Sequence, residues 1–257
     1  MGLFKPNKFL ILASALILAM AVFFLVPQKI QAATDSDQDR LSDEAEEKIF
    51  HTDSNNPDTD GDGFSDYDEI YHGYNPRSKN KIKLSQTDSD NDGAPDSWEI
   101  KLKLDLLNPD TDNDGQTDGQ EINAGTDPKS ADNQKISKQI NVSLNQQKLT
   151  YYFGQTKLEE FLISSGVKRM PSPVGDFTIL DKVLSKDYGG TGYNFFFPNT
   201  NWNLHFTTKQ YRYYIHGAYW HNKFGQPMSH GCINVSYSNM ARLYNFAEVG
   251  TKLAIKP

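Results

Sequence analysis

The chain contains a single cysteine, Cys232, among its 257 residues. One thiol excludes an internal disulfide, and with it the small secreted folds that rely on a disulfide framework. A lone thiol is then either an inert buried side chain or a retained nucleophile. Which of these applies depends on the compartment of the protein and on the residues around Cys232.

The amino-terminal segment contains a long apolar run, residues 9–26, which Lys5 and Lys8 precede. A cationic start before an apolar run is typical of an export signal, and about 17–25 apolar residues span a bilayer. We therefore interpret residues 1–33 as a hydrophobic helix that is either a cleaved signal peptide or a membrane anchor. Both interpretations place the rest of the chain outside the cytoplasm, in the cell envelope, held at the membrane or secreted.

The net charge of −7 hides two regions of opposite sign. Residues 35–121 carry 25 acidic and 8 basic side chains, whereas residues 122–257 carry 8 acidic and 15 basic ones. This asymmetry predicts two modules with different partners, and we expect no nucleic acid among them.

The acidic region is an internal repeat of twelve residues, read as DSDQDRLSDEAE, DTDGDGFSDYDE, DSDNDGAPDSWE and DTDNDGQTDGQE from residues 35, 58, 88 and 110. Each copy has acids at positions 1, 3, 5, 9 and 12, the ligand spacing of an EF-hand-type calcium loop. A solvated acidic linker would not keep this register. The predicted ligands are Asp35, Asp37, Asp39, Asp43, Glu46, Asp58, Asp60, Asp62, Asp66, Glu69, Asp88, Asp90, Asp92, Asp96, Glu99, Asp110, Asp112, Asp114, Asp118 and Glu121.

Position 6 of each loop requires a sharp turn, and it is occupied by Gly63, Gly93 and Gly115 in three copies. In the first copy it is Arg40, for which a left-handed backbone costs about 1–2 kcal/mol. We expect the first loop to bind its ion most weakly or to adjust its geometry.

The segments NPDTDGDG and NPDTDNDG resemble thrombospondin type 3 repeats, and the resemblance covers residues 35–128. It implies an extended, calcium-wrapped rod with little hydrophobic core, in which a short helix follows each loop. A dockerin-like module that binds a cohesin is the alternative that uses similar loops. Residues 129–138 are polar and rich in turn formers, and we interpret them as a linker.

Residues 139–257 are long enough for one domain with its own core. Short segments with alternating apolar residues predict strands, as at Ile140, Val142 and Leu144. Only SYSNMARLYNFAEVG has helical spacing, and Gly250 follows as a stop signal. We predict a mostly β, sandwich-like domain with one clear helix, and we assign most strand aromatic residues to its core.

The segment SHGCIN, residues 229–234, places the thiol close to one histidine, His230, and a second candidate, His216, lies earlier in the chain. A thiol becomes a strong nucleophile when a neighbouring imidazole takes its proton. His230 precedes Cys232 by two residues, and His216 ends the predicted strand YRYYIHG. The backbone N–H groups around Gly231 and Cys232 are candidate oxyanion donors.

The segment IHGAYWHNKFGQPMSHGCIN resembles the L,D-transpeptidase catalytic domain, and the resemblance covers residues 138–257. It implies that Cys232 is the nucleophile, that His216 is its general base and later acid, and that the Gly217 carbonyl orients the imidazole. Ser229, His230 and Asn234 would shape the site or bind substrate. Asn234 departs from the arginine that many members carry, and Ser172 from a frequent threonine.

The implied reaction is acyl transfer on peptidoglycan in cell wall biogenesis. The thiolate attacks residue three of a tetrapeptide stem, the terminal D-alanine leaves, and an amine on a second stem forms a 3→3 cross-link. This chemistry requires no cofactor, so calcium would be structural. The expected partners are peptidoglycan stem peptides and, through the amino-terminal segment, the membrane.

Two alternatives come from different classes of protein. His216, His221, His230 and Cys232 are all possible zinc ligands, although their spacing is not that of common zinc sites. The second alternative is a non-catalytic, calcium-dependent adhesin whose basic domain binds the anionic cell wall.

Overall fold

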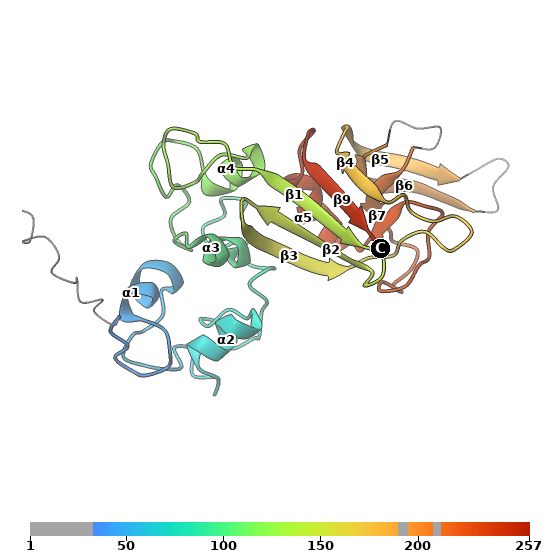
Figure 1. The fold of residues 1–257 in the computed structure, drawn as a ribbon. Coiled ribbons are helices and arrows are strands. Elements are labelled where there is room, and N and C mark those ends of the chain that lie inside the picture. Colours follow the sequence, from blue (N-terminus) through green and yellow to red (C-terminus); the bar gives the residue numbers. More distant parts are fainter. Residues whose placement is uncertain (1–32, 190–194, 208–211) are drawn as a thin grey trace, which may run out of the picture. The chain divides into compact units, whose positions relative to one another are not determined.

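The computed structural model of the chain describes residues 33–189, 195–207 and 212–257 (Figure 1). The predicted amino-terminal hydrophobic helix lies outside these residues, apart from its last position. Within the described ranges, the helices are all too short or too polar to cross a bilayer. Residues Asp35–Pro257 form one compact unit.

Each acidic loop leads directly into a short helix that starts at its ninth residue, and in three loops the side chain of the eighth residue caps that helix. The side chains of Ser42, Ser65 and Thr117 accept hydrogen bonds from the backbone N–H three residues later. Pro95 takes this place in the third loop without a side-chain cap. The helices are α1 (Asp43–Ala45), which continues as a π-helical turn (Glu46–Phe50), α2 (Asp66–His72), α3 (Asp96–Leu102) and α4 (Asp118–Ala124).

The basic region folds into two β-sheets and one helix, as predicted. The first sheet has the order β3-β2-β1-β9-β4, and only its β1–β9 pair is parallel. Its strands are β1 (Lys138–Ser143), β2 (Lys148–Phe153), β3 (Thr156–Leu162), β4 (Gly175–Thr178) and β9 (Lys252–Lys256).

The second sheet has the order β5-β6-β7-β8, and its β7–β8 pair is parallel. The helix α5 (Tyr237–Phe246) follows β8 and buries Met240, Leu243 and Phe246 in the core. The helix predicted from the apolar spacing of this segment is therefore confirmed. The strands are β5 (Asp181–Gly189), β6 (Phe196–His205), β7 (Tyr214–Gly217) and β8 (Ile233–Val235).

The third and fourth repeats contribute to the same hydrophobic core as the β-sheets. Ala94, Trp98, Leu104 and Ile122 belong to one buried cluster with residues of both sheets and α5. The Trp98 ring makes edge contacts with Tyr151 and Phe246 at centroid distances of 6.0 Å. The expectation of a rod with little core is therefore wrong for these two repeats. Their apolar side chains gain burial by packing on the neighbouring domain.

Residues 129–138, predicted as a linker, are folded. An antiparallel bridge between Thr126 and Lys135 closes the fourth repeat. Lys138 is the first residue of β1, and its buried Nζ donates to Asn123 O at 2.7 Å and Phe246 O at 2.8 Å. Burial lowers the pKa of Lys138 to about 8. A buried amine that bridges repeat, strand and helix is structural, so the boundary between the modules is not a free linker.

The four repeats are joined in pairs by the aspartate at position 5. Asp39 Oδ2 accepts from the backbone N–H of Tyr67 at 3.1 Å, and Asp92 Oδ2 accepts from that of Gly119 at 2.6 Å. The first loop thus contacts α2, and the third loop contacts α4. This pairing accounts for the shorter sequence spacing within each pair than between the pairs.

The close approach of the third loop to α4 predicts the effect of a methyl group at Gly119. A Cβ there would lie 2.6 Å from Asp92 O and 2.7 Å from Ala94 N. We expect Gly119→Ala to lower the free energy of unfolding by about 1–3 kcal/mol, although alanine favours helix. The exposed Gln120→Ala on the same helix should change it by less than about 0.5 kcal/mol. Denaturant unfolding checks this, and equal stability of the two variants would contradict the pairing.

Candidate functional site

The parallel pairing of β7 with β8 brings the two predicted catalytic side chains to one cavity. The register places His216 opposite Asn234, and Cys232 immediately precedes β8. The cavity has a volume of about 300 Å³. Its walls are Tyr188, Phe195, Phe197, His216, Trp220, His221, Met228, Ser229, His230, Cys232 and Asn234.

His216 is held in one orientation by its backbone neighbour. Its Nδ1 lies 2.9 Å from the carbonyl oxygen of Gly217. A carbonyl only accepts, so Nδ1 carries the proton and Nε2 is the free acceptor of a neutral imidazole. The ring is 3% exposed and stacks on Tyr188 at a centroid distance of 4.4 Å. Burial lowers the pKa of His216 to about 4, which keeps the ring neutral at physiological pH.

The Cys232 thiol is partly buried, and its environment favours the protonated form. Burial raises its pKa to about 11, although the Tyr214 backbone and the Lys186 charge act in the opposite direction. The resting pair is therefore a thiol and a neutral imidazole, not a thiolate and an imidazolium. Proton transfer must accompany attack on a substrate.

Ser229 and Gly231 shape the turn that presents the thiol. Ser229 Oγ donates to Cys232 O and accepts from Gly231 N at 3.2 Å. Gly231 has φ +114°, and a Cβ there would meet the Tyr213 ring at 2.3 Å. Only glycine fits this close approach. Gly217 is restricted in the same way, because its Cβ would lie 2.5 Å from the ring of Tyr237 on α5.

Unlike the buried His216, His230 lies at the rim of the cavity with its side chain exposed. Its exposed ring stacks on Phe195 at 4.7 Å. Phe197 stacks on Trp220 at 3.9 Å, so aromatic rings form much of the cavity wall. The aromatic residues of this wall are exceptions to the prediction that most strand aromatics lie in the core. The run of three phenylalanines in NFFFPN is the available signal, since strand alternation cannot bury all three on one face.

Asn234 is a buried residue of the cavity wall, and its side chain contacts His221, which lines the same cavity. One side-chain amide atom lies 3.2 Å from His221 Nε2. His221 Nδ1 accepts from the backbone N–H of Lys223 at 3.2 Å. Burial and the Lys223 charge lower the pKa of His221, so its ring is neutral. This chain of polar contacts holds the Asn234 side chain at the cavity wall.

The zinc alternative requires three ligand atoms that face one point. Across the residues that the structure describes, such groups occur only in the four acidic loops. The three histidines and the thiol of the cavity do not form one, so the geometry does not favour a zinc site.

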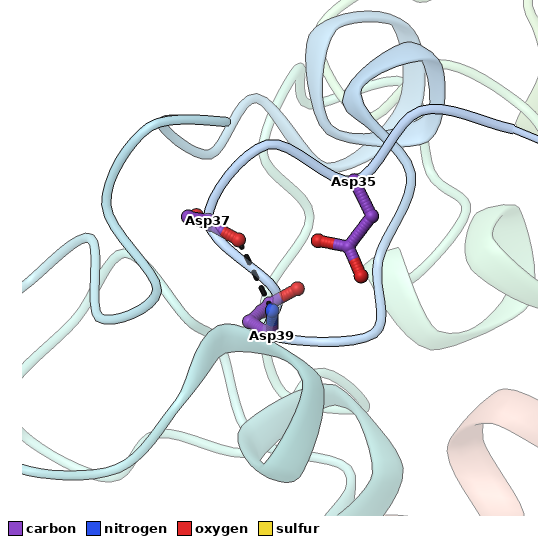
Figure 2. A group of neighbouring side chains, drawn as sticks. All are labelled: Asp35, Asp37 and Asp39. Carbon is purple, nitrogen blue, oxygen red and sulfur yellow. Dashed lines mark hydrogen bonds between the residues drawn. The ribbon is translucent and has the colours of Figure 1, made fainter.

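The acidic loops gather their carboxylates as the spacing predicts at positions 1, 3 and 5. Ligand oxygens of these three aspartates lie within 4.8 Å of one another in every loop. Figure 2 shows the first such group, Asp35, Asp37 and Asp39, which converge on the inside of one turn.

The glutamate at position 12 of each loop adds buried carboxylate oxygens that lack a hydrogen-bond partner. Glu99 is 0% exposed, and neither of its carboxylate oxygens has a hydrogen-bond partner. Burial and neighbouring aspartates raise the pKa of Glu99 to about 9, and those of Glu69 and Glu121 to about 7. A cation would satisfy these oxygens and offset the repulsion, so the loops fit a calcium ion.

The aspartates at position 9, which the spacing predicts as ligands, make hydrogen bonds within their own loops. Asp66 accepts from the backbone N–H and the hydroxyl of Thr59 at 2.9 and 2.6 Å, which occupies both carboxylate oxygens. Asp43, Asp96 and Asp118 accept the same two bonds from the hydroxyl residue at position 2 of their loops. The position-9 side chains therefore close the loop, and they lie outside the groups of converging oxygens.

The first loop keeps the common geometry despite Arg40. Its φ is +89°, close to +97° at Gly63 and +95° at Gly115. The Arg40 N–H donates to Asp35 Oδ2 at 3.2 Å, as the Gly63 N–H donates to Asp58 Oδ2 at 2.9 Å. The loop accepts backbone strain rather than adjusting its shape.

Comparison with known families agrees with both modules. The family model of the L,D-transpeptidase catalytic domain matches residues 137–255. That of the bacterial TSP3 repeat matches residues 35–57, 58–76, 88–103 and 110–131. The chain therefore carries an L,D-transpeptidase catalytic domain preceded by bacterial TSP3 repeats, as the sequence motifs predicted. No curated protein matches the chain.

Solved structures with similarity to the chain include several L,D-transpeptidases. One from Mycobacterium smegmatis is 23% identical with a TM-score of 0.45, over 49% of this chain and 61% of that one. L,D-transpeptidase 3 from Mycobacterium tuberculosis is 18% identical with a TM-score of 0.45, over 48% and 63%. The catalytic domain from Enterococcus faecium is 28% identical with a TM-score of 0.41, over 46% and 96%. The chain thus spans less than two thirds of the two mycobacterial proteins.

The conformation at position 6 predicts a larger loss of stability at Gly63 than at the equivalent Arg40. Gly63→Ala places a Cβ in open space but on a left-handed backbone, so it should lower the free energy of unfolding by about 1–2 kcal/mol. Arg40→Ala keeps a Cβ in the same conformation and should cost only about 0.5 kcal/mol, from its lost contact with Tyr67. Denaturant unfolding in calcium-free buffer compares them, and equal losses would contradict the interpretation.

The raised pKa of Cys232, about 11, predicts how its alkylation depends on pH. Only the thiolate reacts, so the rate with iodoacetamide should rise about tenfold per pH unit from pH 6 to pH 9. The same chain unfolded in guanidinium is the control, and its rate should level off above an ordinary thiol pKa of about 8.5. Intact mass spectrometry measures both rates. A plateau at neutral pH in the folded protein would instead indicate a preformed thiolate.

Proposed function

We propose that the protein is a peptidoglycan L,D-transpeptidase that uses Cys232 as its nucleophile and forms 3→3 cross-links between stem peptides. The observation that carries this proposal is the cavity that contains both Cys232 and a buried His216 oriented by Gly217. Its location would be the cell envelope, where the amino-terminal segment attaches it to the membrane or directs its secretion.

The reaction begins when His216 Nε2 takes the thiol proton while the sulfur attacks the carbonyl carbon of residue three of the donor stem. Gly231 N–H already donates to Ser229 Oγ, so we assign stabilisation of the oxyanion to the Cys232 N–H. The imidazolium then gives its proton to the leaving amine of D-alanine, which leaves a thioester on Cys232. Deacylation reverses these roles, because His216 removes a proton from the acceptor amine as the amine attacks the thioester.

The cavity walls favour an extended peptide close to the thiol. Aromatic rings of Phe197 and Trp220 provide apolar contact area, and the Asn234 amide supplies a buried polar group. Ser229 holds the turn, whereas His230 at the rim would contact the more distant part of the substrate. These placements support the substrate-binding roles of Ser229, His230 and Asn234.

The repeat region would bind structural calcium. Aspartates at positions 1, 3 and 5 and the glutamate at position 12 would hold the ion in each loop, and its charge would satisfy their buried oxygens. Position 9 would support the loop through its bonds to position 2. The ion takes no part in acyl transfer.

Acylation by a carbapenem tests the proposed nucleophile and base separately. The full-length protein should gain the mass of one carbapenem, and Cys232→Ala should gain none. His216→Ala should acylate about 10²–10⁴-fold more slowly, because it lacks the general base. His230→Ala, with its exposed ring at the rim, is the matched control and should slow acylation by less than about tenfold.

Intact mass spectrometry over time measures these rates, and a synthetic tetrapeptide stem with an acceptor amine tests the transfer. Equal acylation of the two histidine variants would exclude His216 as the base. An adduct on Cys232→Ala would exclude the nucleophile. Loss of D-alanine without a cross-linked product would indicate a carboxypeptidase instead.

A further inference from the structure

Helix α3 joins the third acidic loop to the catalytic domain through adjacent residues. Glu99 faces the loop, where both its carboxylate oxygens are buried without a partner. Trp98 is 2% exposed and packs against the β-sheet and α5. Lys101, one turn after Trp98, donates from Nζ to Leu158 O on β3. Figure 1 shows α3 beside β3.

A series of contacts connects Trp98 to the helix that packs behind the catalytic strand pair. Its indole Nε1 donates to Glu159 Oε1 at 3.0 Å. Arg242 on α5 holds the same carboxylate through two bonds, at 2.7 and 3.0 Å. The α5 helix begins two residues after β8, the strand that follows Cys232, and its Tyr237 ring packs against Gly217.

The side of α3 that faces the third loop lies against several carboxylates, which repel one another unless a cation is bound. Aspartates Asp88, Asp90 and Asp92 converge in the loop, and the Glu99 carboxylate is buried near them. Asp92 also accepts from the N–H of Gly119, so a change in this loop reaches α4 as well. The position of α3 therefore depends on how these charges are balanced.

The second repeat provides an internal contrast. Asp58, Asp60 and Asp62 form the same converging group, and Glu69 follows at position 12 of the sequence pattern. Its helix, however, exposes Tyr71 by 72%. Among the residues that the structure describes, the shared core contains side chains from the third and fourth repeats but not from the first two.

We propose that the third loop is a calcium-dependent part of the catalytic domain, in which the bound ion fixes α3 and thereby stabilises β3 and α5. The first and second loops do not have this effect. This inference rests on the proposed calcium binding. Through Arg242 and α5, the ion in this loop controls the order of the wall behind the catalytic strand pair, although it is not part of the catalytic cavity.

Hydrogen exchange of the full-length protein, followed by mass spectrometry, tests the proposal. Saturating calcium should slow exchange in peptides covering β3 and α5 at least tenfold relative to chelator. Glu99→Gln should abolish this calcium-dependent protection. The matched Glu69→Gln in the second loop should retain it, because α2 does not contribute to the shared core. Trp98→Phe should bind calcium normally but show less protection, since it lacks the indole donor to Glu159.

Titration calorimetry with calcium on the same variants separates the possible failures. Calcium binding without protection of β3 and α5 would overturn the coupling and leave calcium binding intact. Equal loss of protection in Glu99→Gln and Glu69→Gln would overturn the special role of the third loop. Absence of calcium binding would overturn both calcium proposals, whereas acylation of Cys232 would still report on the transpeptidase.

Discussion

The pairing of two short parallel strands positions the chemistry of the C-terminal domain. His216 lies on β7 and Cys232 directly precedes β8, so their relation depends on a pairing of only three residues on each strand. Such short strands are stable only when they are buried, and every residue of both is buried. β6 pairs with β7, and α5 packs on β6 and β7. The ring of Tyr237 packs against Gly217, so the helix that covers the pair also fixes the residue that orients the imidazole.

Burial favours the neutral form of the titratable groups in both kinds of site. In the cavity it lowers the pKa of His216 and raises that of Cys232, so both groups are neutral at rest. In the acidic loops burial raises the pKa of Glu99, and several carboxylates remain close together. Protonation or a cation can balance that cluster, and a cation does so for all its members at once.

The two modules are distinct in composition but joined in three dimensions. Trp98 and Ile122 from the repeats are as deeply buried as Ile140 and Phe246 from the catalytic domain. Lys138 connects the fourth repeat to β1 and α5 through two buried carbonyl groups. A repeat region that ends in such contacts sets the orientation of the domain that follows it, which a flexible linker would not do.

Local patterns determined much of this protein. Alternating acids produced the aspartate groups at positions 1, 3 and 5, and apolar periodicity produced the strands and α5. The motifs around His216 and Cys232 indicated two residues that line one cavity. Only the tertiary structure decided that Asp66 and its equivalents close their loops, that Phe197 and Trp220 line the cavity, and that Trp98 enters the core. Spacing along the chain specifies which side chains share a turn or a face. The partner against which that face is buried comes from residues distant in sequence, and local spacing does not encode it.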